Sequence, residues 1–246
     1  MVKNKIGVAL IGSGRAGMIH AHNFRGSVPG AVIAAVCDPV VEAAKAAAEE
    51  LELDNYYTDY KDVLALDNID AVIVATPTKY HCEIVCAAAK AGKHILCEKP
   101  MAMSVEECDI MDKTAKENGV TLQIAFMRRF DASFAAAKEM VDAGEIGDVV
   151  MVRSNTRGPS IPKPWMYDIS KSNGPLAEVC SHDIDSLRWF TGADFKTVYA
   201  SAKLGWAKKS MSDEGVNMAP LLDTILEEVP APEGDPDLPL QTIICN

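Results

Sequence analysis

Three glycines near the amino end of the chain have the spacing of a phosphate-binding turn, G-x-G-x-x-G. An apolar run expected to form a buried strand precedes them, and residues expected to form a helix follow them. In that setting the first glycine allows a tight turn, the second lets the backbone approach a pyrophosphate, and the third lets the helix pack closely on the strand. The phosphates would lie at the positive end of the helix, where we expect five residues to hold them: Gly12, Gly14, Arg15, Ala16 and Gly17.

The next predicted strand ends at Asp38, and Pro39 disfavours a helix at that point. A carboxylate in this position can accept hydrogen bonds from both hydroxyls of an adenosine ribose, and it would repel a 2′-phosphate. These features predict NAD, rather than NADP, as the cofactor. The alternative is a structural glycine turn with a solvated aspartate, and only the strand–turn–helix context argues against it.

The elements that must position these residues alternate regularly over residues 1–125. Short apolar runs predict strands at Ile6–Ile11, Ala31–Cys37, Ala71–Ala75, His94–Cys97 and Val120–Phe126. Helical patterns between them cover Arg15–Ser27, Glu42–Leu51, Asp59–Leu66, Tyr80–Ala91 and Ser104–Asn118. This repeated alternation predicts an α/β fold with a doubly wound, parallel Rossmann sheet.

The rhythm changes after residue 126. We expect helices at Asp131–Gly144 and Pro175–Thr191, a strand at Val149–Arg153, and a loop at Asn155–Asn173. Residues 126–200 are therefore interpreted as an incomplete α+β substrate domain. Residues 201–246 are proline-rich and acidic and close on an apolar run, Leu240–Asn246, so that they read as a foreign or irregular tail.

Composition excludes several classes of partner. The formal net charge of −11 would repel a nucleic-acid backbone, and no apolar run approaches the roughly 20 residues of a membrane span. The amino end leads directly into a strand, without the pattern of a signal peptide. The seven scattered cysteines predict reduced thiols and a cytoplasmic protein. Cys82 and Cys86 share a helix face but have no further metal-ligand pair, so we expect no metal.

A second group of motifs follows the later strands of the predicted sheet. They are Thr76-Pro77, His81, Gly92-Lys93-His94 and Glu98-Lys99-Pro100. In this order, and with the glycine turn, they resemble the Gfo/Idh/MocA oxidoreductase family over about residues 4–200. The resemblance implies a cofactor site that includes Thr76, Pro77, His81, Glu98 and Lys99, with Glu98 on the nicotinamide ribose. From the residues alone, His81 is also a candidate for loop packing, and His20 and His22 are expected to be structural.

The predicted second helix carries Leu176–Asp185, which is similar to the family's L-x-D-x-x-x-H-x-I-D segment. Glu178 stands where many relatives have aspartate. Glu178 and His182 are four residues apart and share a helix face, with Asp185 further along the same stripe. Such a pair is usually a surface pair, and the accompanying motifs favour catalysis instead.

Removing hydride from a secondary alcohol also requires a base for the hydroxyl proton, and histidine titrates in the right range. We expect Glu178 to orient His182, and Lys99 to stabilise the developing alkoxide. The segment Phe126–Asp131 resembles the start of the second domain in inositol 2-dehydrogenases. The substrate is therefore expected to be a cyclitol or sugar, and the residues considered for its binding are Arg128, Trp165, Asp168, Asp185 and His182. Arg128 is equally a solvated charge, and Trp165 and Asp168 equally belong to a packed loop.

Residues 199–246 resemble a segment of BipA/TypA-type translational GTPases, with Ser201-Ala202-Lys203 as the guanine-contacting loop. The chain has neither a G-x-x-x-x-G-K-[ST] loop nor an N-K-x-D segment, so GTP binding is not expected. An apparent chimera would leave two alternatives: an active dehydrogenase, or a catalytically incompetent NAD-binding remnant. Relatives form homo-oligomers through the sheet of the second domain, and for this chain that association is left open.

Overall fold

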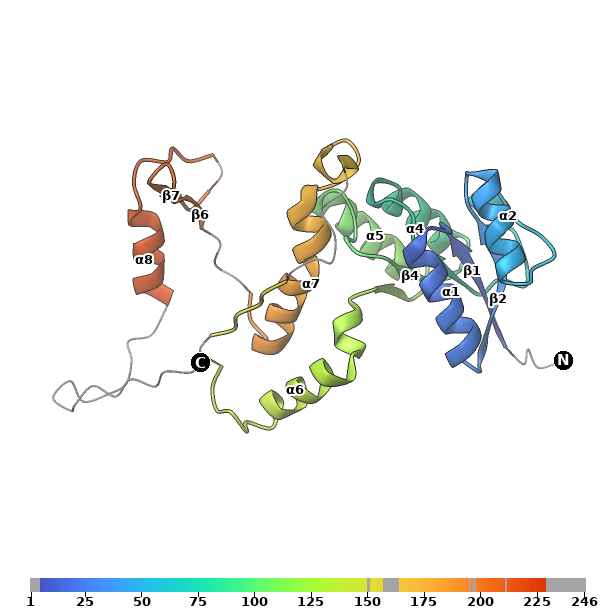
Figure 1. Ribbon diagram of the computed structural model, residues 1–246, viewed down its shortest axis with the longest axis horizontal. Coiled ribbons are helices and arrows are strands. Elements are labelled where there is room, and N and C mark those ends of the chain that lie inside the picture. The colour runs from blue at the N-terminus through green and yellow to red at the C-terminus, as the bar shows by residue number, and fades with distance from the viewer. Residues whose placement is uncertain are drawn as a thin grey trace. The chain divides into compact units, whose positions relative to one another are not determined.

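The computed structural model describes residues 5–149, 151–156, 164–194, 196, 198–210 and 212–228. The chain divides into two compact units, Met1–Thr191 and Gly192–Asn246. The first unit contains all the residues expected to bind cofactor or substrate (Figure 1).

A five-stranded parallel sheet forms the centre of the first unit, in the order β2-β1-β3-β4-β5. The strand order reverses between β1 and β3, which is the switch point where open α/β sheets bind ligands. The predicted doubly wound sheet is confirmed. The strands are β1 (Ile6–Ile11), β2 (Ala31–Cys37), β3 (Ala71–Val74), β4 (His94–Cys97) and β5 (Leu122–Ile124).

Helices cover both faces of this sheet because successive strand residues point to opposite sides. Val8 and Leu10 of β1 belong to a core that includes Ala21 of α1 and the α2 alanines, whereas Ala9 and Ile11 belong to the opposite core. Figure 1 shows α1 and α2 near β1 and β2, with α4 and α5 beside β4. The helices are α1 (Arg15–Ser27), α2 (Val41–Glu50), α3 (Tyr60–Leu64), the short 3₁₀ helix η1 (Thr78–Tyr80), α4 (His81–Lys90) and α5 (Val105–Glu117).

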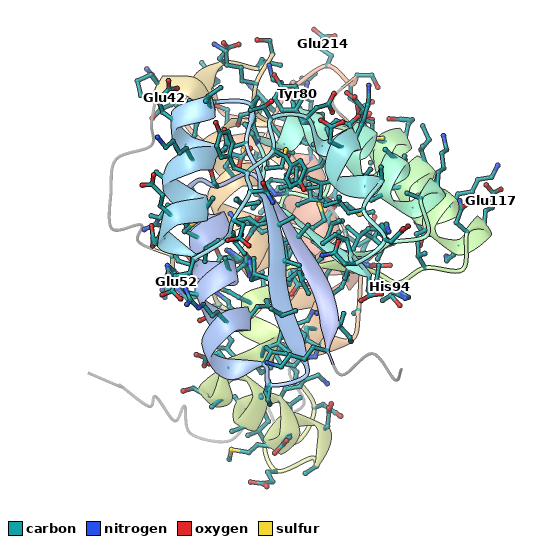
Figure 2. The ribbon with its side chains drawn as sticks, turned by 90° about the vertical axis from the view of Figure 1, so that its right-hand side faces the viewer. Glu42, Glu52, Tyr80, His94, Glu117 and Glu214 are labelled. Carbon is teal, nitrogen blue, oxygen red and sulfur yellow. The ribbon has the colours of Figure 1, made fainter. Side chains whose placement is uncertain are left out.

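Motif residues lie at both ends of the parallel strands, and those at the amino ends have structural contacts. Tyr80 follows the carboxyl end of β3 and His94 begins β4, and Figure 2 places the two at opposite ends of the strands. His94 accepts a hydrogen bond at Nδ1 from the Thr121 N–H, 3.0 Å away, and Lys93 donates to the carbonyl oxygens of Leu66 and Ile69. The Gly92-Lys93-His94 motif therefore has structural contacts at the amino ends of the strands, opposite the carboxyl ends where open α/β sheets bind ligands.

The rest of the first unit consists of helices η2 (Met127–Phe130), α6 (Ala132–Asp142), η3 (Pro164–Tyr167) and α7 (Gly174–Thr191). Asp131 begins α6 by accepting hydrogen bonds from the N–H groups of Ser133 and Phe134. The strand predicted at Val149–Arg153 is wrong for its described residues, which lie in no strand. A strand needs a hydrogen-bonding neighbour, and no described strand of this unit pairs with that segment.

Aromatic side chains join α6 to α7. The ring centroids of Phe134 and Phe190 are 6.4 Å apart, those of Trp189 and Phe190 are 5.4 Å apart, and the Arg129 guanidinium lies 5.7 Å from the Trp189 ring. Leu187, Trp189 and Phe190 are consequently half-buried. A cavity of about 380 Å³ remains beside them, lined mainly by apolar residues of α6 and of the segment after it.

The second unit contains a two-stranded antiparallel hairpin, β6 (Tyr199–Ser201) and β7 (Trp206–Lys208), followed by α8 (Ala219–Glu228). Ser201 closes the hairpin turn, because its carbonyl oxygen accepts from the N–H groups of Leu204 and Gly205. The apolar run Leu240–Asn246 lies outside the described residues. None of the helices in the described part of the chain is long and apolar enough to cross a membrane.

The structure forms no disulfide among the six cysteines of the described residues. Burial, together with neighbouring carboxylates, raises the pKa of the Cys37 thiol to about 12. Burial also raises the pKa of Cys82 to about 11, with Cys86 as a further cause. Thiols held this far above neutral pH are poor nucleophiles and poor metal ligands.

Candidate active site

Each of the three glycines in the turn occupies a position that suits glycine for a different structural reason. Gly12 has a φ of +96°, and a Cβ there would lie 2.6 Å from the Ala75 carbonyl oxygen. A Cβ on Gly17 would lie 2.0 Å from the Gly12 carbonyl oxygen, so only glycine lets α1 approach the turn this closely. A Cβ on Gly14 would meet nothing within 4 Å. That open space, at the end of a helix, is where a pyrophosphate could approach the backbone.

The N-terminus of α1 has the features of an anion site. Gly14 is its N-cap and offers no side-chain hydrogen bond, and the first turn carries no acidic residue. The N–H groups of this first turn therefore have no side-chain cap among the described residues, and the helix dipole favours a negative charge beside them. Arg15 and Ala16, predicted to contact the phosphates, lie in this first turn.

Asp38 is held in place by the glycine turn itself. Its Oδ2 atom accepts hydrogen bonds from the Ser13 N–H at 2.9 Å and the Ser13 hydroxyl at 3.0 Å, and its Oδ1 atom accepts from the Val40 N–H at 3.0 Å. Sequence reasoning missed Ser13, which occupies a variable position of the motif. The contacts fix the carboxylate at the carboxyl edge of β2, where an adenosine ribose is expected.

The Glu98-Lys99-Pro100 turn follows β4 at the same edge of the sheet. The Glu98 carboxylate accepts from His20 Nε2 at 2.8 Å and from the Lys99 N–H at 3.0 Å. Burial alone would raise the pKa of Glu98, but these hydrogen bonds and the charge of Lys99 outweigh it and lower the pKa. The Lys99 ammonium donates to the main-chain carbonyl oxygen of Glu178 at 2.6 Å, which brings the turn against α7.

His81 connects the two motif turns. Its side chain is 1 % exposed, with Nδ1 3.0 Å from the Pro100 carbonyl oxygen and Nε2 2.8 Å from the Thr76 carbonyl oxygen. Both ring nitrogens therefore face protein acceptors, which favours the packing interpretation of His81 over direct contact with a cofactor. Thr76 and Pro77 lie between β3 and η1, and the buried Thr76 hydroxyl has no partner among the described residues.

The expected pairing of Glu178 with His182 is wrong. The Glu178 carboxylate, buried against η1, accepts from the Thr78 hydroxyl at 3.2 Å. The Nδ1 atom of His182 is buried and has no partner in the described part of the chain. Two residues on one helix face can form a pair but need not do so. The buried Glu178 carboxylate instead accepts its hydrogen bond from Thr78, which is distant in sequence.

His182 nevertheless lies in the electrostatic environment of the proposed site. Burial is the largest cause that lowers the pKa of its imidazole, and the positive charges of Lys99 and Arg128 lower it further. Glu98 and Asp183 oppose that shift without reversing it. The neutral imidazole, which is the form that can accept a proton, is therefore favoured.

Two arginines of η2 form ion pairs with two aspartates of α7, which follow His182 on that helix. Arg128 donates to Asp183 at 2.8 Å, and Arg129 binds Asp185 in a bidentate manner, with contacts of 2.7 and 2.9 Å. Sequence reasoning had considered Arg128 and Asp185 for substrate and missed their partners. The sequence signal for these ion pairs is that Arg128 and Arg129 are adjacent and that two acids, Asp183 and Asp185, are two residues apart.

Asp183 accepts hydrogen bonds from three different side chains. Its Oδ1 atom accepts from the hydroxyls of Ser154 and Thr156 as well as from Arg128. Burial would raise its pKa, but these three hydrogen bonds and the arginine charge lower the pKa to about 2. The carboxylate therefore stays ionised and organises the region around His182.

Replacing Asp183 with asparagine is expected to destabilise the protein by about 2 kcal/mol at neutral pH. Because the folded pKa lies below the unfolded value, this stability is present above about pH 4 and is lost as the pH falls toward about 2. Urea unfolding across that range measures it. The matched control is Glu117→Gln on the exposed end of α5, which should change little, and an unchanged acid transition in Asp183→Asn would contradict the prediction.

The remaining substrate candidates lie in the loop before α7. Asp168 accepts from the Ser170 N–H and hydroxyl and pairs with Lys171 at 2.7 Å. The hydrogen bond from Lys171 is the first of the causes that lower the Asp168 pKa to about 2. The carboxylate is thus engaged within its own loop, which favours the packed-loop interpretation. Trp165 belongs to η3, and its side chain lies outside the described residues.

The residues present fit a dinucleotide. Three buried polar atoms have no partner among the described residues, and two of them, the Thr76 hydroxyl and His182 Nδ1, belong to the expected cofactor and substrate positions. Buried polar groups are rarely left unpaired, so such atoms mark places where a ligand can bind. The third is the Ser181 hydroxyl, beside His182 on α7. No cluster of three or more potential metal ligands occurs in the described ranges.

Two known family models match successive parts of the chain. Residues 6–126 match the model described as "Oxidoreductase family, NAD-binding Rossmann fold", and residues 134–219 match the "GFO/IDH/MocA C-terminal domain". The chain belongs to the Gfo/Idh/MocA oxidoreductase family. The match confirms the predicted Rossmann fold and its NAD cofactor. It also extends to residue 219, past residue 200 where we expected the family likeness to stop, and the resemblance of 199–246 to translational GTPases stays a prediction.

Individual members of the family are similar over most of this chain. Scyllo-inositol 2-dehydrogenase (NAD(+)) of Bacillus subtilis is 38% identical over 203 residues, which are 82% of this chain and 59% of that protein. Myo-inositol 2-dehydrogenase of Thermotoga maritima is 34% identical over 88% of this chain and 62% of its own length. The chain therefore spans about three-fifths of the length of these relatives.

Solved structures give the same result. Scyllo-inositol dehydrogenase from Lactobacillus casei with bound NAD(H) and scyllo-inositol superimposes with a TM-score of 0.71 at 31% identity. The superposition covers 79% of this chain and 58% of that one. The superposition shows that this chain and that dehydrogenase share a fold over most of this chain.

Proposed function

We propose that this chain is an NAD-dependent dehydrogenase that transfers a hydride between nicotinamide and a secondary hydroxyl of a cyclitol or sugar. The observation that carries the proposal is the 2.6 Å hydrogen bond from the Lys99 ammonium to the Glu178 main chain, which joins the Glu98-Lys99-Pro100 turn to the helix of His182. The names of the three relatives described above, which are inositol dehydrogenases, support the substrate class.

NAD, when bound, supplies the group that accepts the hydride. Backbone N–H groups of Gly14 to Gly17 would hold its diphosphate at the N-terminus of α1. Asp38, fixed by Ser13, would accept the hydroxyls of the adenosine ribose. Thr76, Pro77 and Glu98 would line the nicotinamide half, with the unpaired Thr76 hydroxyl available for a hydrogen bond.

The chain's own residues would handle the proton. His182 would accept it from the substrate hydroxyl, which its lowered pKa and unpaired ring nitrogen permit. Lys99 has three N–H donors, of which one is used by the Glu178 carbonyl, so that others can stabilise the developing alkoxide. Glu178 would act as a positioning residue through its main chain and its bond to Thr78, and not by orienting the imidazole.

Substrate hydroxyls would bind beside His182. Arg128 and Asp185 each already form an ion pair, yet a carboxylate and a guanidinium retain further hydrogen-bonding sites for a polyol. Asp168 and Trp165 remain proposed substrate contacts from the sequence. A cytoplasmic location and the absence of a nucleic-acid partner belong to the same proposal, and the free thiols and the net charge of −11 support them.

The alternative is an NAD-binding remnant of such an enzyme without turnover. Calorimetric titration of the purified full chain with NAD, followed by NADH production with myo-inositol, scyllo-inositol and related polyols, separates the two. We expect binding and turnover. Binding without turnover on every polyol supports the remnant, and absence of NAD binding rejects both.

Replacing Asp38 with alanine is expected to weaken NAD binding by about tenfold and to reduce the preference for NAD over NADP, because the carboxylate that repels a 2′-phosphate is removed. Dissociation constants for both dinucleotides measure the effect. Asp59→Ala serves as the control, since its carboxylate caps α3 through the Lys61 N–H. A preference that is unchanged in Asp38→Ala would show that the ribose does not meet this carboxylate.

A further inference from the structure

One hydrogen bond joins the phosphate-binding helix to the Glu98-Lys99-Pro100 turn. His20 lies in α1, the helix that begins at the glycine turn, and its Nε2 atom is 2.8 Å from Glu98 Oε1. The two side chains are 21% and 19% exposed, so the contact is mostly shielded from water. β1, which leads into α1, and β4, which leads into Glu98, are separated in the sheet by β3. The bond therefore spans the edge of the sheet along which a dinucleotide would extend.

This bond fixes the orientation of the Glu98 carboxylate. Oε1 accepts from His20 and Oε2 accepts from the Lys99 N–H, so the group cannot rotate without breaking one of the two contacts. Each oxygen keeps a second lone pair for a ligand hydroxyl. The same contacts lower the Glu98 pKa against the effect of burial, which keeps the group an acceptor. Because Lys99 is the next residue, the contact also fixes the start of the turn that carries its ammonium.

The same helix contains a natural comparison. His22 forms a pair with Glu50, with Nε2 2.6 Å from Oε1, but these side chains are 49% and 56% exposed. Glu50 belongs to α2 and has no contact with either motif turn in the described residues. Both pairs join a histidine of α1 to a glutamate. Glu98 belongs to a motif turn and Glu50 does not, so the His22–Glu50 pair is the control for the His20–Glu98 pair.

We infer that His20 is a positioning residue, which holds Glu98 against the nicotinamide half of NAD and so couples the two halves of the cofactor site. The inference rests on the proposed NAD binding. A residue that only stabilised α1 would affect the whole dinucleotide, because the diphosphate lies on the N-terminus of this helix. A residue that acts through Glu98 affects the nicotinamide half and leaves the adenosine diphosphate half unchanged.

The experiment compares the affinity of the full chain for NAD and for ADP, by calorimetry, in His20→Leu, His20→Gln and His22→Leu. We expect His20→Leu to weaken NAD by about tenfold, the effect of losing one charge-assisted hydrogen bond, and to leave ADP unchanged. His20→Gln keeps an N–H donor and should recover part of the loss. His22→Leu should bind both ligands as the unchanged protein does. In a Glu98→Gln background, His20→Leu should weaken NAD by less than it does alone.

Several results would overturn the inference. Equal weakening of NAD and ADP in His20→Leu would make His20 a structural residue of α1, and full additivity with Glu98→Gln would mean that it does not act through Glu98. Unchanged NAD affinity in His20→Leu would reject the inference while the proposed function stands. If the unsubstituted protein binds ADP but not NAD, the proposed function and this inference fail together.

Discussion

Replacing Lys99 with methionine should lower kcat for NADH production from myo-inositol by about 10²–10³-fold, the usual effect of removing one donor to a developing oxyanion. Methionine keeps an unbranched side chain, one atom shorter than that of lysine, and provides no N–H group. The substitution also removes the contact with the Glu178 carbonyl oxygen, so a small loss of thermal stability is expected alongside. Steady-state kinetics at saturating NAD, with the melting temperature recorded in parallel, measures both.

The same substitution should shift the titration of His182. The charge of Lys99 is one of the causes that lower the imidazole pKa, after burial, so its removal should raise that pKa. In the direction of alcohol oxidation the neutral imidazole is the base, and activity should rise with pH as His182 loses its proton. In Lys99→Met the residual activity should therefore rise at a higher pH than in the unsubstituted protein. An NMR titration of His182 tests the shift without depending on turnover.

Lys113→Met on the exposed face of α5 is the matched control. It removes the same charge from an exposed pair with Glu117, and Lys113 is not among the charges that shift the His182 pKa, so kcat and the His182 titration should stay unchanged. A Lys99→Met variant with full activity would reject the proposed role of the ammonium. A His182 pKa that falls or stays constant would mean that the two side chains do not interact.

The sequence predicted the strand, glycine turn and helix well because their determinants are local. Gly12, Gly14 and Gly17 act through the backbone of one turn, and the strand before and the helix after them are visible in neighbouring residues. Gly12 and Gly17 have in the structure the steric reasons that the pattern assigns to them, and the space beside Gly14 is open. The position of Asp38 was predictable for the same reason, because it directly follows the buried strand β2.

The region around His182 was harder to predict because its contacts join distant segments. Helical spacing placed Glu178 and His182 on one face, but it could not show that Thr78, from another helix, takes the carboxylate. The pairs Arg128–Asp183 and His20–Glu98 depend on the same kind of long-range packing. Periodicity reports which face a residue occupies, whereas the choice among possible partners on that face is made by tertiary structure.

The predicted strand at Val149–Arg153 failed for a related reason. Its apolar and β-branched residues fit a pleated surface, but such a preference is realised only where another strand provides hydrogen bonds. In the described residues the segment instead lines a cavity with α6 and Phe190. Strand propensity therefore describes a segment's suitability for a sheet and does not guarantee that a neighbouring strand is present.

The glycine turn offers a test in which stability and binding separate. Gly14→Ala should leave the fold almost unchanged, because its φ of −68° suits alanine and a Cβ would meet nothing within 4 Å. The methyl group would, however, occupy the space through which the diphosphate approaches the backbone. We expect NAD affinity to fall by about tenfold or more, since at least one charge-assisted hydrogen bond would be lost.

Gly17→Ala should behave in the opposite way. Its Cβ would lie 2.0 Å from the Gly12 carbonyl oxygen, which is backbone and cannot yield without moving the turn, so we expect destabilisation of about 1–3 kcal/mol. Gly26→Ala, at the far end of α1 with open space around it, is the control and should affect neither property. Urea unfolding and NAD titration of the three variants measure the separation. Normal NAD binding by Gly14→Ala would contradict the proposed approach of the diphosphate to the backbone at Gly14.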